Sequence, residues 1–199
     1  MFVSVKYGGI QTMTKQAKVL NEKEINKLFK ICELTKYPVR NKLIVAFSFF
    51  GGLRAIEIAN LNVSDILSPT NEVNDIIVLS KEQTKGSKSN TVYVGKKLQR
   101  EILRFISKYP NTIYSKDKKL FKTQRGTFSS QTIQNLFRNL YQLANIPNAS
   151  SHSGRRTFIT NLSEKGISTR VIQELARHSS MVTTQRYIDV SDDKLKKAV

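Results

Sequence analysis

The stretch SSHSGRRTFIT, residues 150–160, holds one of only two histidines in a chain of 199 residues. This residue, His152, stands three positions before Arg155, the first of an arginine pair. The other histidine, His178, lies in ARHSS at residues 176–180, again beside an arginine. Histidine transfers protons near neutral pH, and arginine binds phosphate oxygens through a planar fork of donors. Both histidines are therefore placed where they could act together with arginine on one anionic group.

The charge of the chain indicates a polyanionic partner. Lysine and arginine number 33 against 15 aspartate and glutamate, which gives a formal net charge of +18 and an isoelectric point near 10.1. A folded domain this basic is typical of nucleic-acid binding, with a ribosomal or merely soluble basic protein as the alternative on charge alone. Hydrophobic residues make up 39%, which is enough for the core of one domain.

Cysteine content favours a reducing compartment, and hydropathy argues against a membrane span. Cys32 is the only cysteine, which excludes a disulfide within the chain and a cysteine-based zinc site. The longest apolar stretch, LIVAFSFFGGL at 43–53, is too short to span a membrane. The segment 1–13 lacks the layout of a signal peptide. We therefore expect a cytoplasmic protein without membrane contact, in which residues 1–17 form a flexible leader.

Hydrophobic periodicity predicts a mainly α domain (α+β) with one small antiparallel sheet. The first helix is expected at 21–36, because Asn21 and Glu24 have the spacing of a capping box. The second is expected from Pro38 to the Gly51–Gly52 pair. Strand-like segments at 75–80 and 90–95, with a Gly–Ser turn between them, predict a hairpin. Further helices are expected at 54–61, 98–109, 129–145, 152–166, 168–178 (capped by Ser168), 181–190 and 192–198.

Six residues with phosphate-binding, proton-transferring or nucleophilic side chains occur in order along the chain. They are Arg54, Lys85, His152, Arg155, His178 and Tyr187. The segments that hold them are GGLRAIEIANLNVSDI at 51–66, QTKGSKSNTVYV at 83–94, HSGRRTFITNLSEKG at 152–166 and IQELARHSSMVTTQRYI at 172–188. Together the four segments resemble the catalytic domain of the tyrosine recombinases, the phage integrase family. The resemblance covers residues 18–190 and depends on the ordered set, since His-x-x-Arg alone is common.

This resemblance implies a site-specific DNA recombinase that cleaves and rejoins strands through a covalent 3′-phosphotyrosyl intermediate, in integration, excision or inversion. Tyr187 would attack phosphorus. Arg54, just inside its helix after the double glycine, and Arg155 would bind the nonbridging oxygens, because each guanidinium can contact two of them. His152 and Arg155, three residues apart, are expected on one helix face.

Proton transfer is assigned to the remaining residues. A free tyrosine has a pKa near 10, so Tyr187 needs a base, and His152 is the candidate. Lys85 would protonate the leaving 5′-oxygen, with Lys81 and Lys88 nearby as alternatives. His178 would donate a hydrogen bond to the scissile phosphate.

The resemblance also implies partners and needs. The expected partner is double-stranded DNA, on which the chain would act as a homotetramer at paired sites. Without DNA the chain would be a monomer or a weak oligomer. Accessory DNA-bending proteins are possible further partners. No cofactor and no metal are expected, because the arginines carry the positive charge and the sequence has no acidic cluster or phosphate-binding glycine loop. The host would be a bacterial or phage-infected cell.

Four neighbours of the six residues also have expected roles. Glu57 is expected to pair with Arg54, and Arg156 to contact phosphate or remain solvated. Arg177 stands where the family usually has the glycine of Leu-Gly-His, so it should alter that turn or contact DNA. Gly154 stands where many members have leucine, which lowers helix propensity and removes an apolar contact.

The chain resembles short family members such as the fimbrial phase-variation invertases, or a fragment of a longer integrase with a separate DNA-clamping domain. Residues 18–190 would be the catalytic domain, and 191–199 a tail that contacts a neighbouring protomer or frays. Two other functions remain open: a noncatalytic DNA-binding regulator of the same fold, and a type IB topoisomerase-like enzyme. A metal-dependent nuclease is disfavoured, because the carboxylate cluster it would need is missing.

Overall fold

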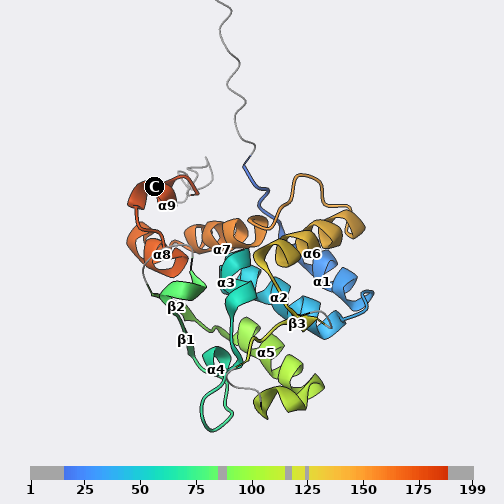
Figure 1. Ribbon diagram of the computed structural model, residues 1–199. Helices are drawn as coiled ribbons and strands as arrows, with labels where there is room; N and C mark the ends of the chain where they lie inside the picture. Colours follow the sequence, from blue (N-terminus) through green and yellow to red (C-terminus); the bar gives the residue numbers. More distant parts are fainter. Residues whose placement is uncertain (1–15, 85–88, 115–117, 124–125, 188–199) are drawn as a thin grey trace, which may run out of the picture.

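The computed structural model describes residues 16–84, 89–114, 118–123 and 126–187. Within these ranges the chain is mainly helical (Figure 1). The helices are α1 Glu22–Glu33, α2 Pro38–Phe50, α3 Ala55–Asn60, α4 Val63–Ile66, α5 Lys96–Lys108, α6 Ser130–Leu143, α7 Ser153–Glu164, α8 Thr169–Ala176 and α9 Met181–Gln185. The strands are β1 Ile76–Leu79, β2 Asn90–Tyr93, β3 Lys122–Thr123 and β4 Gly126–Thr127, and short 3-10 turns span Lys81–Gln83 and Pro110–Tyr114. The predicted mainly helical class with an antiparallel hairpin is confirmed.

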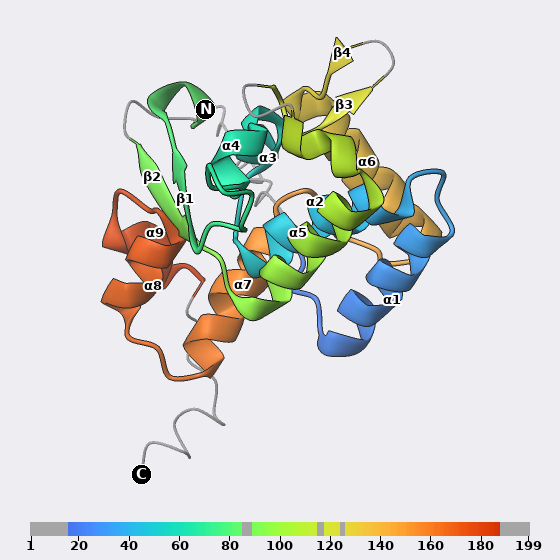
Figure 2. The ribbon, with the colours of Figure 1, turned by 90° about the horizontal axis from the view of Figure 1, so that it is seen from below.

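Helix α2 lies at the centre of the main core. All residues from 43 to 49 are buried, as expected of a helix that is apolar on nearly every side. Helices α1, α5 and α7 pack around it, and Figure 2 shows α5 crossing in front of α2. Helix α2, which ends at the double glycine, therefore contacts both α3 and α7 and positions them.

The local signals at the first two helices are confirmed. Asn21 caps α1, with the reciprocal Asn21–Glu24 hydrogen bonds of a capping box. Helix α2 starts at Pro38 and is followed by Gly51, as predicted. Gly52 has φ +62, and a Cβ there would lie 2.6 Å from the Phe158 ring. The turn into α3 thus requires glycine for both conformation and space.

The predicted hairpin is β1–β2, an antiparallel pair in which Ile76 lies opposite Tyr93 and Leu79 opposite Asn90. Strands β3 and β4 and helix α4 were not predicted. Strands β3 and β4 form a second antiparallel pair of two residues each, too short for alternation to show in sequence. Helix α4 has only four residues, so it shows no helical period.

A second, smaller core joins the C-terminal helices. Buried Ile159 of α7 packs with Ile172 and Ala176 of α8, and Tyr187 packs against this cluster from beyond α9. Figures 1 and 2 both show α8 beside β2 and next to α9, with both helices away from α1. The predicted helix at 181–190 ends earlier, since α9 stops at Gln185, and residues 188–190 and the helix predicted at 192–198 lie outside the described residues.

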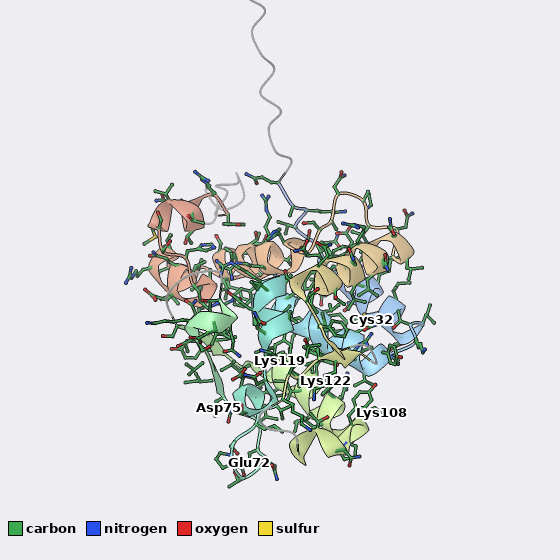
Figure 3. All side chains as sticks on the ribbon, viewed as in Figure 1. Cys32, Glu72, Asp75, Lys108, Lys119 and Lys122 are labelled. Atoms are coloured by element: carbon green, nitrogen blue, oxygen red, sulfur yellow. The ribbon has the colours of Figure 1, made fainter. Side chains whose placement is uncertain are left out.

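The single cysteine and the two acidic residues labelled in Figure 3 lie far from this C-terminal region. Cys32 is buried in α1, on the side of the molecule opposite α8 and α9 (Figure 3), and burial raises the pKa of its thiol to about 12. Glu72 and Asp75 lie near α4, at the end away from α6 and α7.

Among the described helices, none has both the length and the apolar character needed to cross a bilayer.

Gly154 brings α7 into close contact with α2. A Cβ at this position would lie 2.2 Å from the Oγ and 2.9 Å from the Cβ of Ser48, and 2.9 Å from the Phe49 ring. Rotating the Ser48 hydroxyl would relieve only the first of these overlaps. The glycine therefore sets the distance between the helices, a role that its lower helix propensity does not reveal.

We predict that Gly154→Ala destabilises the protein by about 1–2 kcal/mol, although alanine favours a helix. Overpacking a dense core costs about 1–3 kcal/mol, which exceeds the propensity gain of about 0.5–1 kcal/mol. Urea denaturation would measure the free energy of unfolding.

Two further variants test the cause. Gly95→Ser adds a side chain where nothing lies within 4 Å of the new Cβ, and it should leave stability nearly unchanged. The exchange Ser48→Gly with Gly154→Ala should recover part of the loss. A Gly154→Ala protein as stable as the original would contradict the close-contact explanation.

Candidate active site

Arg155 lies on the buried face of α7 and is 4% exposed. Its Nη1–H donates to the carbonyl oxygen of Gly52 at 2.6 Å, and its Nη2–H donates to the carbonyl oxygen of Ala176. These bonds connect the turn before α3 with the end of α8. Because a guanidinium carries five N–H donors, others remain for a ligand. Burial, with Arg54 and Arg177 nearby, lowers the pKa of Arg155 to about 9, so the side chain is still a cation at neutral pH.

Arg54 is fixed by Glu57, as predicted. The Glu57 carboxylate accepts from the Arg54 backbone N–H at 2.9 Å and from its Nη1–H at 2.7 Å. The expectation that Arg54 lies just inside the helix is wrong: Arg54 is the N-cap in an extended conformation, and α3 begins at Ala55. The N-cap position places the backbone N–H within reach of Glu57, while the side chain stays 26% exposed.

Arg177 follows the last residue of α8 in a left-handed conformation, with φ 56 and ψ 46. That conformation costs an L-residue about 1–2 kcal/mol and favours glycine, so the turn keeps a shape that glycine would adopt. The side chain is only 2% exposed and pairs with Glu57 at 3.0 Å. The predicted DNA contact is therefore wrong, because the guanidinium points into the protein.

Glu57 is the acidic residue in the middle of this arginine group. Burial would raise its pKa, but Arg177, the backbone and side chain of Arg54, and Arg155 outweigh that effect and lower the pKa. Glu57 is completely buried and ionised. Three guanidiniums against one carboxylate leave the site positively charged, which suits an anionic ligand.

His178 follows Arg177 directly. Its Nδ1 lies 3.0 Å from the Oγ1 of buried Thr184 in α9. Burial first, and then the charges of Arg155, Arg54 and Arg177, lower the pKa of His178 to about 4. The ring is therefore neutral at pH 7, and when the Thr184 hydroxyl donates to Nδ1 the proton lies on Nε2.

Tyr187 lies two residues beyond α9 and stacks on His178, with ring centroids 5.5 Å apart and an interplanar angle of 23°. The Arg156 guanidinium lies over the tyrosine ring at 5.9 Å from its centroid. Arg156 therefore has an aromatic partner, a contact that neither predicted role anticipated. Of the six predicted residues, the structure brings together Arg54, Arg155, His178 and Tyr187.

The other two predicted residues are His152 and Lys85. His152 is exposed at the N-cap of α7, one helical turn before buried Arg155. His152 and Arg155, which were predicted to share a helix face, therefore differ in exposure: His152 is exposed and Arg155 is buried. Lys85 and the alternative Lys88 lie outside the described residues, while Lys81 begins the 3-10 turn after β1.

Sequence reasoning missed Thr184 and the buried role of Arg177. Thr184 lies six residues after His178, a spacing without a known local signal. The one available signal for Arg177 was its position in place of a glycine, which indicates left-handed backbone but does not reveal the partner, Glu57, 120 residues away.

Residues 18–194, nearly the whole chain of 199, match the Phage integrase family. The chain belongs to this family. Among curated members, the tyrosine recombinase XerA of Pyrococcus furiosus is 30% identical over 182 residues, which cover 92% of this chain and 60% of that protein. The tyrosine recombinase XerD of Oceanobacillus iheyensis is 30% identical over 195 residues, which cover 94% and 63%.

Solved structures of integrase-family proteins have the same fold. A crystal structure of XerA recombinase has a TM-score of 0.73 at 27% identity, covering 91% of this chain and 63% of that one. A Tn1549 transposon integrase in complex with transposon right end DNA has a TM-score of 0.74 at 16% identity, covering 95% and 67%. The chain spans about 60% of the length of the curated relatives it matches.

We predict that the ring of His178 titrates near pH 4 in the folded protein, against about 6.5 when unfolded. Between these values the unfolded state binds more protons, so the free energy of unfolding falls as the pH drops from 6.5 to 4. NMR titration of the ring would test the pKa, with His152→Gln to assign the two signals. In His178→Gln the slope of stability against pH in this window should be smaller, and equal slopes would contradict the lowered pKa.

Proposed function

We propose that this chain is the catalytic part of a site-specific DNA recombinase that cleaves and rejoins strands through a 3′-phosphotyrosyl intermediate. The observation that carries the proposal is the stacking of Tyr187 on His178, next to Arg155 and Arg54. A hydroxyl nucleophile, a neutral hydrogen-bond donor and two guanidiniums are the groups that phosphoryl transfer to tyrosine requires. Family membership and a net charge of +18 support the same function.

In this mechanism Tyr187 forms an Oη–P bond while the bond from phosphorus to the 5′-oxygen breaks. The tyrosine proton passes to His152, and Lys85 gives a proton to the leaving 5′-oxygen. The strand then holds a 3′-phosphotyrosine, and a 5′-hydroxyl can reverse both steps. Because the ester energy is retained in the new bond, rejoining needs no nucleotide cofactor, and no metal is assigned to the site.

The two arginines stabilise the charge that grows on the nonbridging oxygens. Arg54 and Arg155 are already held by Glu57 and by backbone carbonyls, so they do not reorganise during the reaction. His178, neutral at pH 7, donates through Nε2–H when Thr184 holds Nδ1. A neutral ring adds a hydrogen bond without a further positive charge beside three guanidiniums.

Partners and setting follow from the same function. The proposed substrate is double-stranded DNA, with four copies of the chain acting on two paired sites and accessory DNA-bending proteins assisting. Residues 18–190 would be the catalytic domain, and 191–199 would contact a neighbouring protomer. The setting is the cytoplasm of a bacterial or phage-infected cell, and the outcome, for instance inversion as in short invertase-like members, depends on the arrangement of the DNA sites.

We expect the protein to form a covalent adduct with a nicked suicide substrate in EDTA, and the adduct to be lost in Tyr187→Phe. The nick lets the short 5′-hydroxyl strand diffuse away, so the phosphotyrosyl product accumulates on a denaturing gel. Sites would come from binding selection on random DNA. Tyr93→Phe, which alters an exposed tyrosine on β2, is the matched control and should cleave normally.

The alternatives give different results. Tight binding to a verified site without any adduct would replace the recombinase with a noncatalytic DNA-binding regulator. Relaxation of supercoiled plasmid without a specific site would favour a type IB topoisomerase-like enzyme. An adduct that persists in Tyr187→Phe would contradict the assignment of the nucleophile.

We predict that Arg155→Ala and Arg54→Ala each slow adduct formation by about 10²–10³-fold, the usual cost of losing one preorganised donor to a developing anion. Single-turnover rates at saturating DNA would measure the loss. Arg138→Ala, which removes an exposed arginine of α6 that donates to the Asn135 side chain, serves as the charge-matched control. Losses of equal size in Arg138→Ala would mean that the effect is general electrostatics.

A further inference from the structure

We propose that Arg177 is a positioning residue of this site, which holds Glu57 and through it the phosphate-binding Arg54. The inference rests on the proposed function, because it assigns Arg54 to the phosphate. The Arg177 side chain is buried, and its hydrogen bonds run to backbone carbonyls and to Glu57. It acts on the reaction only through another side chain.

The guanidinium of Arg177 joins three parts of the fold. Its Nη1–H groups lie 3.3 Å from the carbonyl oxygen of Gly51 and 3.1 Å from that of Leu175. Its Nη2–H groups lie 2.7 Å from the carbonyl oxygen of Gly52 and 3.0 Å from Glu57 Oε2. One side chain thus connects the double-glycine turn, helix α3 and the end of α8.

Glu57 transmits this contact to Arg54. One carboxylate oxygen, Oε1, accepts from Arg54 Nη1–H, and the other, Oε2, accepts from both the Arg54 backbone and Arg177. With Oε2 held by Arg177, the carboxylate cannot rotate away from Arg54 without breaking a buried ion pair. The direction of the Arg54 guanidinium is therefore set in part by a residue 120 positions further along the chain.

The identity of the residue at 177 supports a role for its side chain. A left-handed backbone favours glycine, so arginine is disfavoured here unless its side chain compensates. Lysine would keep the charge but not the planar fork that reaches three carbonyls and a carboxylate together. Glycine would relax the backbone and remove every one of these contacts.

A double-mutant cycle tests whether Arg177 acts through Arg54. We expect Arg177→Met to slow adduct formation on the order of 10²-fold, as a small misplacement near the reacting atoms can do, with DNA affinity unchanged. In an Arg54→Ala background the same substitution should have almost no further effect. Equal losses in both backgrounds would overturn the proposal.

Other variants separate positioning from folding. Arg177→Gly suits the left-handed backbone and replaces Arg177→Met in the test if that variant fails to fold. It should fold normally and still form the adduct slowly. Arg177→Lys should lie between Arg177→Gly and the original protein. Arg170→Met, at an exposed arginine of α8 paired with Glu174, is the matched control and should react normally. An Arg177→Gly protein that reacts at the original rate would overturn the proposal.

A readout that needs no reaction separates this proposal from the function itself. In NMR of the free protein labelled with ¹⁵N-arginine, the Arg54 side-chain signals should shift or broaden in Arg177→Gly and stay unchanged in Arg170→Met. If the original protein forms no adduct, the proposed function fails, but this spectrum still decides the role of Arg177. Arg54 signals that are unchanged in Arg177→Gly would overturn that role.

Discussion

A single buried carboxylate, Glu57, holds the arginines of the site in one arrangement. A buried ion costs several kcal/mol unless opposite charge and hydrogen bonds surround it, and Glu57 has both in Arg54 and Arg177. Its ionised form is favoured even though it is completely buried. Without this carboxylate, three guanidiniums would face one another in a region of low dielectric. The double-glycine turn and the end of α8 are joined through the same group.

The excess of positive charge that remains explains the state of the neighbouring side chains. Burial first, and then this excess charge, lowers the pKa of Arg155 to about 9 and that of His178 to about 4. Both effects disfavour the protonated form of these groups, and an anion bound nearby would favour it. The free energy needed to gather like charges is supplied when the chain folds, so it is not required again when a phosphate enters. The small second core of α7 and α8 keeps the tyrosine beside this charge.

Sequence reasoning succeeded where the determining interactions are local. The Asn21–Glu24 capping box, the start of α2 at Pro38 and the Arg54–Glu57 pair each involve residues within a few positions of one another. The Arg177–Glu57 pair and the close approach of Gly154 to Ser48 depend on how distant helices pack, which no local spacing reveals. The order of the six residues pointed to the family, but the roles of His152 and Lys85 remain predictions, because His152 is exposed at the N-cap of α7 and Lys85 lies outside the described residues.

The buried thiol of Cys32 makes the chain convenient for spectroscopy. It is the only cysteine, and with its pKa raised to about 12 almost none of it is thiolate at neutral pH. A second cysteine introduced on an exposed position of α9, such as Val182, would be the one thiol that reacts quickly with a maleimide dye. A fluorophore placed there would report on the surroundings of the tyrosine without prior removal of the native cysteine, and so without opening a cavity in α1.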